Sequence, residues 1–268
     1  MEYINRLDDN KFLREVIQGI KYISWLVFPF IVLTIGNIID TTNNNIDSFL
    51  WLLVSFITTI LVLPIYQKFY MSNDFKIKFD NNTLIQAFIG LLVLIVGLHL
   101  FGYLNNFENS SNQNQLEKIW SANSNLLHIY VIETGFFTPI IEELFFRAFL
   151  YIIIFKASKE IISVFNKELN TKKSQMIINT TFILVSAILF ANSHLTDSFL
   201  TLIPYFYSGL LLGIIYVVTK NLLVPILIHS LNNIIVFLNF NTKEIYLFIL
   251  IIIVVIITNQ FILWINKK

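Results

Sequence analysis

The 268-residue sequence has no cysteine and few charged side chains. Without cysteine the chain cannot form disulfides, thiolate nucleophiles or thiolate metal ligands. Charged residues make up only 13% of the sequence, whereas they approach about a quarter in soluble domains. With 56% hydrophobic residues, 8 Gly and 5 Pro, the composition excludes a water-soluble enzyme and an intrinsically disordered chain. The net charge of +1 gives no indication of a nucleic-acid partner. We therefore expect a protein whose surface faces membrane lipid.

Eight apolar runs are long enough to cross a bilayer as helices, which takes roughly 20 residues each. They cover approximately 22–39, 48–67, 84–104, 126–155, 176–193, 198–219, 222–240 and 245–265. Because backbone in lipid must satisfy its hydrogen bonds internally, we predict an all-α polytopic membrane protein, a bundle of about eight transmembrane helices. The fourth run contains Gly135 and Pro139, which predict a kink or break.

The polar stretches near 105–125 and 156–175 are too short for a second domain, so we expect linkers or surface helices there and a single membrane domain over 1–268. With the N-terminus inside, 15 of the 18 Lys and Arg residues lie in inner segments. Short cytoplasmic loops accumulate basic residues, which predicts a multi-pass protein of the cell membrane with both termini cytoplasmic. No small-residue cleavage pattern follows the first apolar run, so a removable signal peptide is not expected.

The charged residues within the predicted spans all lie in the fourth. They are Glu133, Glu142, Glu143 and Arg147. A charge at mid-bilayer costs about 2.5–3.5 kcal/mol even on insertion scales, so these side chains should face protein or a wet cavity. Glu143 and Arg147 share a helix face and can pair, whereas Glu142 is rotated by about 100° and remains available as a base. A purely structural ion pair is the alternative. Glu133 lies about 13 Å from Glu142 along the helix, and we expect a structural role for it.

The four histidines are His99, His128, His194 and His229. Phe190 and His194 share a face where the fifth span ends, and His229 and Asn233 share a face of the seventh span. The other two histidines lie near span ends and are expected at the membrane interface. A carboxylate, imidazoles and an amide donor are sufficient to hydrolyse a peptide bond with an activated water.

Hydrolysis could also use a metal-bound water or a serine nucleophile. Glu142, His194 and His229 could hold a Zn ion with a bound water, although the sequence contains no HExxH motif that would demand a metal. No serine lies in a GxSxG elbow, which disfavours a serine nucleophile. Separately, Gly209 and Gly213 form a GxxxG pattern, which predicts close helix packing within the bundle or between protomers.

The three motifs EExxxR (142–147), FxxxH (190–194) and HxxxN (229–233) occur in this order in membrane spans. This arrangement resembles the CPBP family (CAAX protease and bacteriocin-processing, or Abi), which includes the type II CAAX prenyl endopeptidases. The resemblance covers about 126–240, which would be the catalytic core. It implies an intramembrane endopeptidase in which Glu142 and His194 activate water and His229 and Asn233 form the oxyanion site. Glu143 and Arg147 would brace this site, with Phe190 as a further supporting residue.

The resemblance implies a membrane-associated peptide or protein as substrate and leaves a glutamate mechanism and a metalloprotease both open. Bacterial members of the family mature peptide signals or bacteriocins or give self-immunity. The abundant Ile, Asn, Lys and Phe suit an AT-rich bacterial genome, which favours peptide processing over cleavage of prenylated substrates. The alternatives are a non-catalytic Abi-type scaffold or immunity protein, and a solute transporter, which the lack of detectable inverted repeats disfavours.

Straight spans would keep the two candidate histidines apart. His194 lies about 30 Å along the fifth span from Ser174, whereas His229 lies only about 12 Å past Asn221. The site therefore requires a tilted, broken or re-entrant fifth or sixth segment, or other span boundaries.

Overall fold

The computed structural model describes residues 53–54, 56–57, 59, 77–104, 108–122, 127–164 and 171–240. These residues form helices and short connections, and none of them belongs to a strand. The all-α prediction is thus confirmed for this part of the chain. The predicted spans 22–39 and 245–265 and most of 48–67 lie outside the described residues, so the count of eight stays a prediction.

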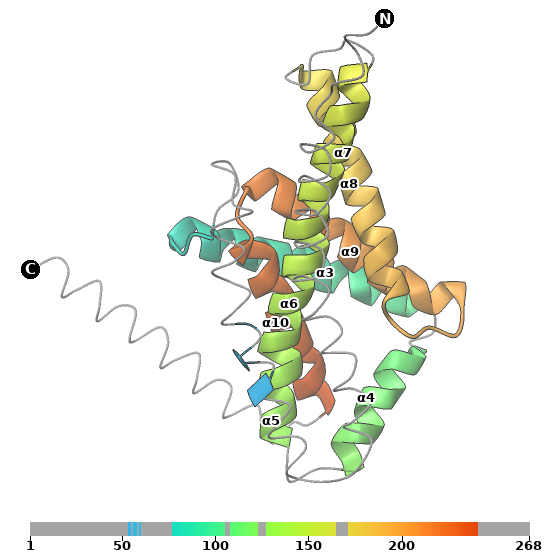
Figure 1. Ribbon diagram of the computed structural model, residues 1–268. Helices are drawn as coiled ribbons and strands as arrows, with labels where there is room; N and C mark the ends of the chain where they lie inside the picture. Colours follow the sequence, from blue (N-terminus) through green and yellow to red (C-terminus); the bar gives the residue numbers. More distant parts are fainter. Residues whose placement is uncertain are drawn as a thin grey trace, which may run out of the picture.

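The described helices follow one another with short connections (Figure 1). They are α3 (Asn81–Leu104), α4 (Ser111–Ala122), α5 (Leu127–Ile132), η3 (Glu133–Phe137), α6 (Thr138–Glu143), η4 (Leu144–Phe149), α7 (Leu150–Val164), α8 (Lys172–Asn192), α9 (Phe199–Thr219) and α10 (Leu223–Phe240). Asn81–Tyr103, Lys172–Asn192 and Phe199–Thr219 are long and apolar enough to cross a membrane, and Leu223–Leu238 is a shorter apolar helix. Helices of this kind belong to a multi-pass membrane protein.

The fourth predicted span is part of one continuous helix from Leu127 to Val164, seen as the green column in Figure 1. The predicted break does not occur, and the helix extends nine residues beyond the expected end at 155. Instead, η3 and η4 are π-helical: Thr138 donates its N–H to Glu133 O, five residues back. A π turn holds one residue more than an α turn, and such bulges are frequent at functional sites. The helix stays continuous because the wider turns absorb the local irregularity.

Helix α10 lies at the centre of the described helices. Ile228 packs with Leu94 of α3 and Leu212 of α9 in one cluster of buried residues. Near its other end, the ring of Phe237 meets Trp120 of α4 edge to face, with centroids 4.9 Å apart. A third cluster joins the α10 start to η4, α7, α8 and α9, and it includes Leu144, Tyr151, Phe182, Tyr216 and Ile226. Side chains of α10 are therefore held from several directions.

The GxxxG pattern of α9 faces α8. A Cβ added to Gly209 would lie 2.9 Å from Ala187 Cα, and one added to Gly213 would lie 3.6 Å from Ile183 Cα. The two backbones approach closely at Gly209, as small residues allow in membrane bundles. The pattern thus serves packing within the chain.

The turn between α9 and α10 is tied to the start of α3 by Asn221. Its Oδ1 accepts from the backbone N–H of Lys78 and of Leu223, each at 3.1 Å. Its Nδ2 donates to Lys78 O at 2.8 Å and to Thr83 Oγ1 at 3.0 Å. The turn itself uses Lys220 in the left-handed conformation, with φ 52°. Every hydrogen-bonding capacity of the Asn221 amide is used, so this corner fixes where α10 begins.

Candidate active site

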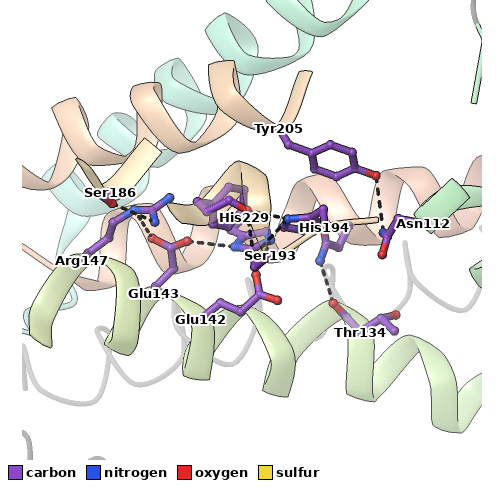
Figure 2. A network of polar contacts seen from close by, with 12 residues as sticks. Asn112, Thr134, Glu142, Glu143, Arg147, Ser186, Ser193, His194, Tyr205 and His229 are labelled. Carbon is purple, nitrogen blue, oxygen red and sulfur yellow. Dashed lines mark hydrogen bonds and ion pairs between the residues drawn. The ribbon is translucent and has the colours of Figure 1, made fainter. Parts of the chain in front are cut away.

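The predicted site residues from three separate helical segments converge in the structure. Glu142 and Glu143 end α6, and Arg147 follows one turn later in η4. His194 lies just after α8, and His229 lies in α10. Figure 2 shows these side chains directed toward one another from their helices. The structure therefore brings together residues that are almost 90 positions apart in the sequence.

Glu143 joins the two sides of the site. Its Oε2 lies 2.9 Å from Arg147 Nε, and both side chains are fully buried. Its Oε1 accepts a hydrogen bond from His229 Nδ1 at 3.0 Å. Arg147 also donates to Ser186 Oγ at 3.4 Å, and Ser186 donates to Phe146 O at 2.9 Å. The predicted pairing of Glu143 and Arg147 is thus present, and the carboxylate of Glu143 is engaged on both oxygens.

Glu142 is placed differently from its neighbour. Its Oε2 is buried and has no hydrogen-bond partner among the described residues. The nearest ionisable group is His229, with Nε2 at 3.8 Å from Glu142 Oε2, beyond hydrogen-bond distance. A carboxylate in this position has lone pairs available to accept a proton.

Phe190 packs between the charged and the imidazole groups. Its ring lies 4.9 Å from Arg147 Cζ, which is within the range of a cation–π contact. The same ring lies 4.8 Å from the ring of His194 and 5.5 Å from that of His229, measured between centroids. Phe190 therefore fixes the spacing of the two histidines.

His194 lies in the turn between α8 and α9, outside both helices. Its Nδ1 lies 2.8 Å from Phe190 O, and since a carbonyl only accepts, Nδ1 carries the hydrogen. In the neutral ring Nε2 is then the acceptor. Burial is the main cause that lowers the pKa of His194, against the opposing effects of the Glu142 charge and the Phe190 carbonyl. The ring is consequently neutral at neutral pH and can accept a proton or a hydrogen bond.

Asn233 is held by the irregular helix opposite it. Its Nδ2 donates to Thr134 O at 2.9 Å. This carbonyl is accessible because the Thr138 N–H goes to Glu133 O, and the next residue, Pro139, has no N–H. Gly135 lets α10 come close, since a Cβ there would lie 2.7 Å from Ile234 Cγ1. One amide hydrogen of Asn233 is thus used to orient the side chain, and the amide carries a second one.

Of the arrangements expected to bring His194 and His229 together, a broken or re-entrant segment does not occur, because α8 and α9 are both continuous helices. The two histidines would lie far apart only if the spans that carry them began at the same depth in the membrane. In Figure 1, α7 and the first turns of α8 extend together beyond the other described helices. His229, by contrast, follows the start of α10 by only six residues. The offset between the two helix starts compensates for the different distances along them.

The zinc alternative requires Glu142, His194 and His229 to hold one ion together. In the described part of the chain, no three His, Asp or Glu side chains are grouped so that they could hold one metal ion. Both imidazoles bind protein oxygens through Nδ1, as metal-bound histidines also do, and this leaves Nε2 of each ring as the available nitrogen.

The remaining candidates are His99, His128 and Glu133. His99 and His128 are exposed, and His99 Nδ1 lies 2.9 Å from Ile95 O. Glu133 is buried at the start of η3.

Three contributors were not anticipated from the sequence. Ser186 precedes Phe190 by four residues, so its place on the Phe190 face of α8 was a signal that could have been used. Thr134 acts through its backbone carbonyl, which its side-chain type does not reveal. Tyr205, whose ring stacks on His194 with centroids 4.2 Å apart and an interplanar angle of 23°, is one aromatic among many in an apolar run. Its position depends on tertiary packing alone.

Comparison with known protein families gives one match. The protein-family model described as Type II CAAX prenyl endopeptidase Rce1-like matches residues 124–235. The EExxxR, FxxxH and HxxxN motifs all fall within this range. Neither the curated proteins nor the solved structures compared with the chain gave a match.

Proposed function

We propose that this chain hydrolyses a peptide bond of a membrane-associated peptide or protein by an activated water, since residues 124–235 match the Rce1-like family of type II CAAX prenyl endopeptidases, a family of proteases. The observation that carries the proposal is the contrast between two adjacent glutamates. Glu143 lies 2.9 Å from Arg147 Nε and 3.0 Å from His229 Nδ1, whereas the ion-pair contact of Glu142, to His229 Nε2, is 3.8 Å long. Such a division leaves one carboxylate as a general base.

In the proposed reaction Glu142 takes a proton from water while His194 Nε2 accepts the second hydrogen of the same water and orients it. The resulting hydroxide attacks the carbonyl carbon of the scissile bond, and a tetrahedral oxyanion forms. Glu142 then returns the proton to the leaving amine as the C–N bond breaks. All the protons in this scheme are carried by residues of the chain, and no step passes through a metal.

The oxyanion would be stabilised from α10. In our proposal the imidazole of His229 is one donor to the oxyanion, and its Nδ1 atom is held by Glu143 Oε1 at 3.0 Å. The second amide hydrogen of Asn233 is the other proposed donor. Because Thr134 O and Glu143 hold these side chains, the donors are preorganised, which is where such stabilisation is strongest.

For the biological setting we propose a protein of the cell membrane with cytoplasmic termini that matures a bacterial peptide or bacteriocin, or protects its producer. The distribution of basic residues supports the orientation, and the Ile, Asn, Lys and Phe content supports the bacterial source. A small peptide precursor encoded beside this gene, cut when co-expressed with the protein, would support this substrate class. Cleavage of prenylated peptides alone would contradict it.

The protease proposal is tested with purified protein in proteoliposomes. The probes are a synthetic peptide ending in a farnesylated Cys-a-a-X box and the same peptide without the prenyl group. Glu142→Gln, His194→Ala and His229→Ala should each lower the rate of cleavage by about 10²–10⁴-fold at equal protein level. The matched controls are His99→Ala and His128→Ala, which remove exposed imidazoles outside the site. Full cleavage by all three site variants would reject the proposal, and a non-catalytic scaffold predicts that Glu142→Gln keeps its cellular function.

A further inference from the structure

The side chain of His194 depends on support from outside its own turn. The residue follows the end of α8, so no continuing helix fixes its backbone. Within its own segment, the ring is held by Phe190 O and lies 3.3 Å from Ser193 Oγ through the same Nδ1 atom. One hydrogen-bonded atom leaves the ring free to swing about that contact. The face of the imidazole is covered by Tyr205 of α9 in a nearly parallel stack, with centroids 4.2 Å apart.

Tyr205 is itself held by the segment that leads into α4. Its hydroxyl lies 2.7 Å from Ser110 Oγ and accepts from Asn112 Nδ2 at 3.4 Å. The hydroxyl is therefore engaged by α4, and it is the ring face that touches His194 (Figure 2). This geometry indicates a packing role for Tyr205 rather than a role as a donor to the substrate.

The same segment also holds the turn that carries His194. The backbone N–H of Asn112 donates to Leu195 O at 2.9 Å, and Ser111 Oγ donates to Asp197 Oδ1. At the other end of α4, Trp120 is buried against Phe237 of α10. Helix α4 thus connects the His194 turn with the helix that carries His229. It precedes the family match, which begins at residue 124.

We propose that Tyr205 is a positioning residue that holds the His194 ring in its working orientation, and that the start of α4 holds Tyr205. This inference rests on the proposed function, because it assumes that His194 acts on the water. A displacement of about 1 Å at a reacting group can lower a rate by about 100-fold. We therefore expect Tyr205→Leu, which removes the stack, to lower kcat by about 10–100-fold. KM should change less than about threefold, since substrate binding does not depend on the water.

Tyr205→Phe keeps the ring and removes the bonds to Ser110 and Asn112. It should restore part of the kcat lost in Tyr205→Leu, and the remaining deficit measures the support that the Tyr205 hydroxyl receives from Ser110 and Asn112. The matched control is Tyr207→Phe on the same helix, which removes a hydroxyl that donates to Val93 O at 2.8 Å away from the site. This control should leave kcat unchanged. Melting temperatures of all variants in detergent show whether a loss of activity reflects unfolding.

The decisive measurement is a double-mutant cycle with the two peptides described above. If Tyr205 acts through His194, Tyr205→Leu should cause no further loss in the His194→Ala background. Equal losses in both backgrounds, or an unchanged kcat in folded Tyr205→Leu, would overturn the inference. His194→Ala with full activity would overturn the proposed function instead, and cleavage of neither peptide by the unaltered protein would count against both.

Discussion

The two adjacent glutamates should respond oppositely to the same substitution. Glu143→Gln removes the counter-charge of Arg147, whose side chain is fully buried and lies 2.9 Å from the lost oxygen. Breaking a buried ion pair by removing one partner costs about 3–5 kcal/mol of stability, because the remaining charge is left uncompensated. Glu142→Gln removes a carboxylate that makes no hydrogen bond to the described residues, so the stability should change by less than about 1 kcal/mol.

Glu142→Gln should lose activity without losing stability. Loss of a general base lowers kcat by about 10²–10⁴-fold, so Glu142→Gln should be inactive although it is folded. The assay combines peptide cleavage in proteoliposomes with the melting temperature of the purified variants. The double variant Glu143→Gln/Arg147→Met serves as a control, since removing both charges should recover most of the lost stability.

Two results would refute this reasoning. Equal destabilisation by Glu142→Gln and Glu143→Gln would mean that both glutamates belong to one structural ion cluster, and that neither is available as a general base. A Glu142→Gln variant that cleaves at the unaltered rate would remove the general base from the mechanism, whatever its stability.

Four further outcomes are expected. Gly209→Ala should lower the stability by about 1–3 kcal/mol, seen as a lower melting temperature, because its Cβ would lie 2.9 Å from Ala187 Cα. Gly213→Ala should leave the melting temperature unchanged, because its Cβ would lie 3.6 Å from Ile183 Cα, and the reverse order of the two variants would contradict the packing. Asn221→Ala should destabilise by about 2 kcal/mol or more through the loss of four hydrogen bonds, and an unchanged melting temperature would contradict that role. Because burial lowers the pKa of His194 in the free protein, the proton that would disable it binds only in more acidic solution, and the acid limb of kcat/KM should lie below about pH 6.5; a limb at or above 6.5 would contradict this. Cleavage should persist after exhaustive chelation verified by metal analysis, and a loss that zinc restores would contradict the metal-free scheme.

The parts of the site that follow from helix periodicity were predictable. Glu143 and Arg147 are four residues apart, and their pairing needs only one helix. The choice of Glu142 as the free carboxylate followed from the same rotation. All-α architecture followed from the apolar runs, because the backbone has no other means of satisfying its hydrogen bonds in lipid.

The parts that depend on how helices are offset along their axes were not predictable. Apolar length alone does not say that α8 begins beside a projecting end of α7, and it was this offset that brought His194 to His229. Tyr205 and the start of α4 gave no signal either, since stacking on a histidine from another segment leaves no periodic trace in the sequence.

The π segment η3 also has a consequence for how relatives of this chain should be aligned. A π turn absorbs one extra residue, so deleting one residue within η3 would leave an ordinary α turn with the two sides of the helix facing as before. The wide turn that presents Thr134 O to Asn233 would be lost while Glu142 kept its place, so Asn233 would lose its support without any change in the motif residues. A single-residue gap in an alignment at 133–137 would thus mark a relative in which Asn233 lacks this support, even where all three motifs are intact.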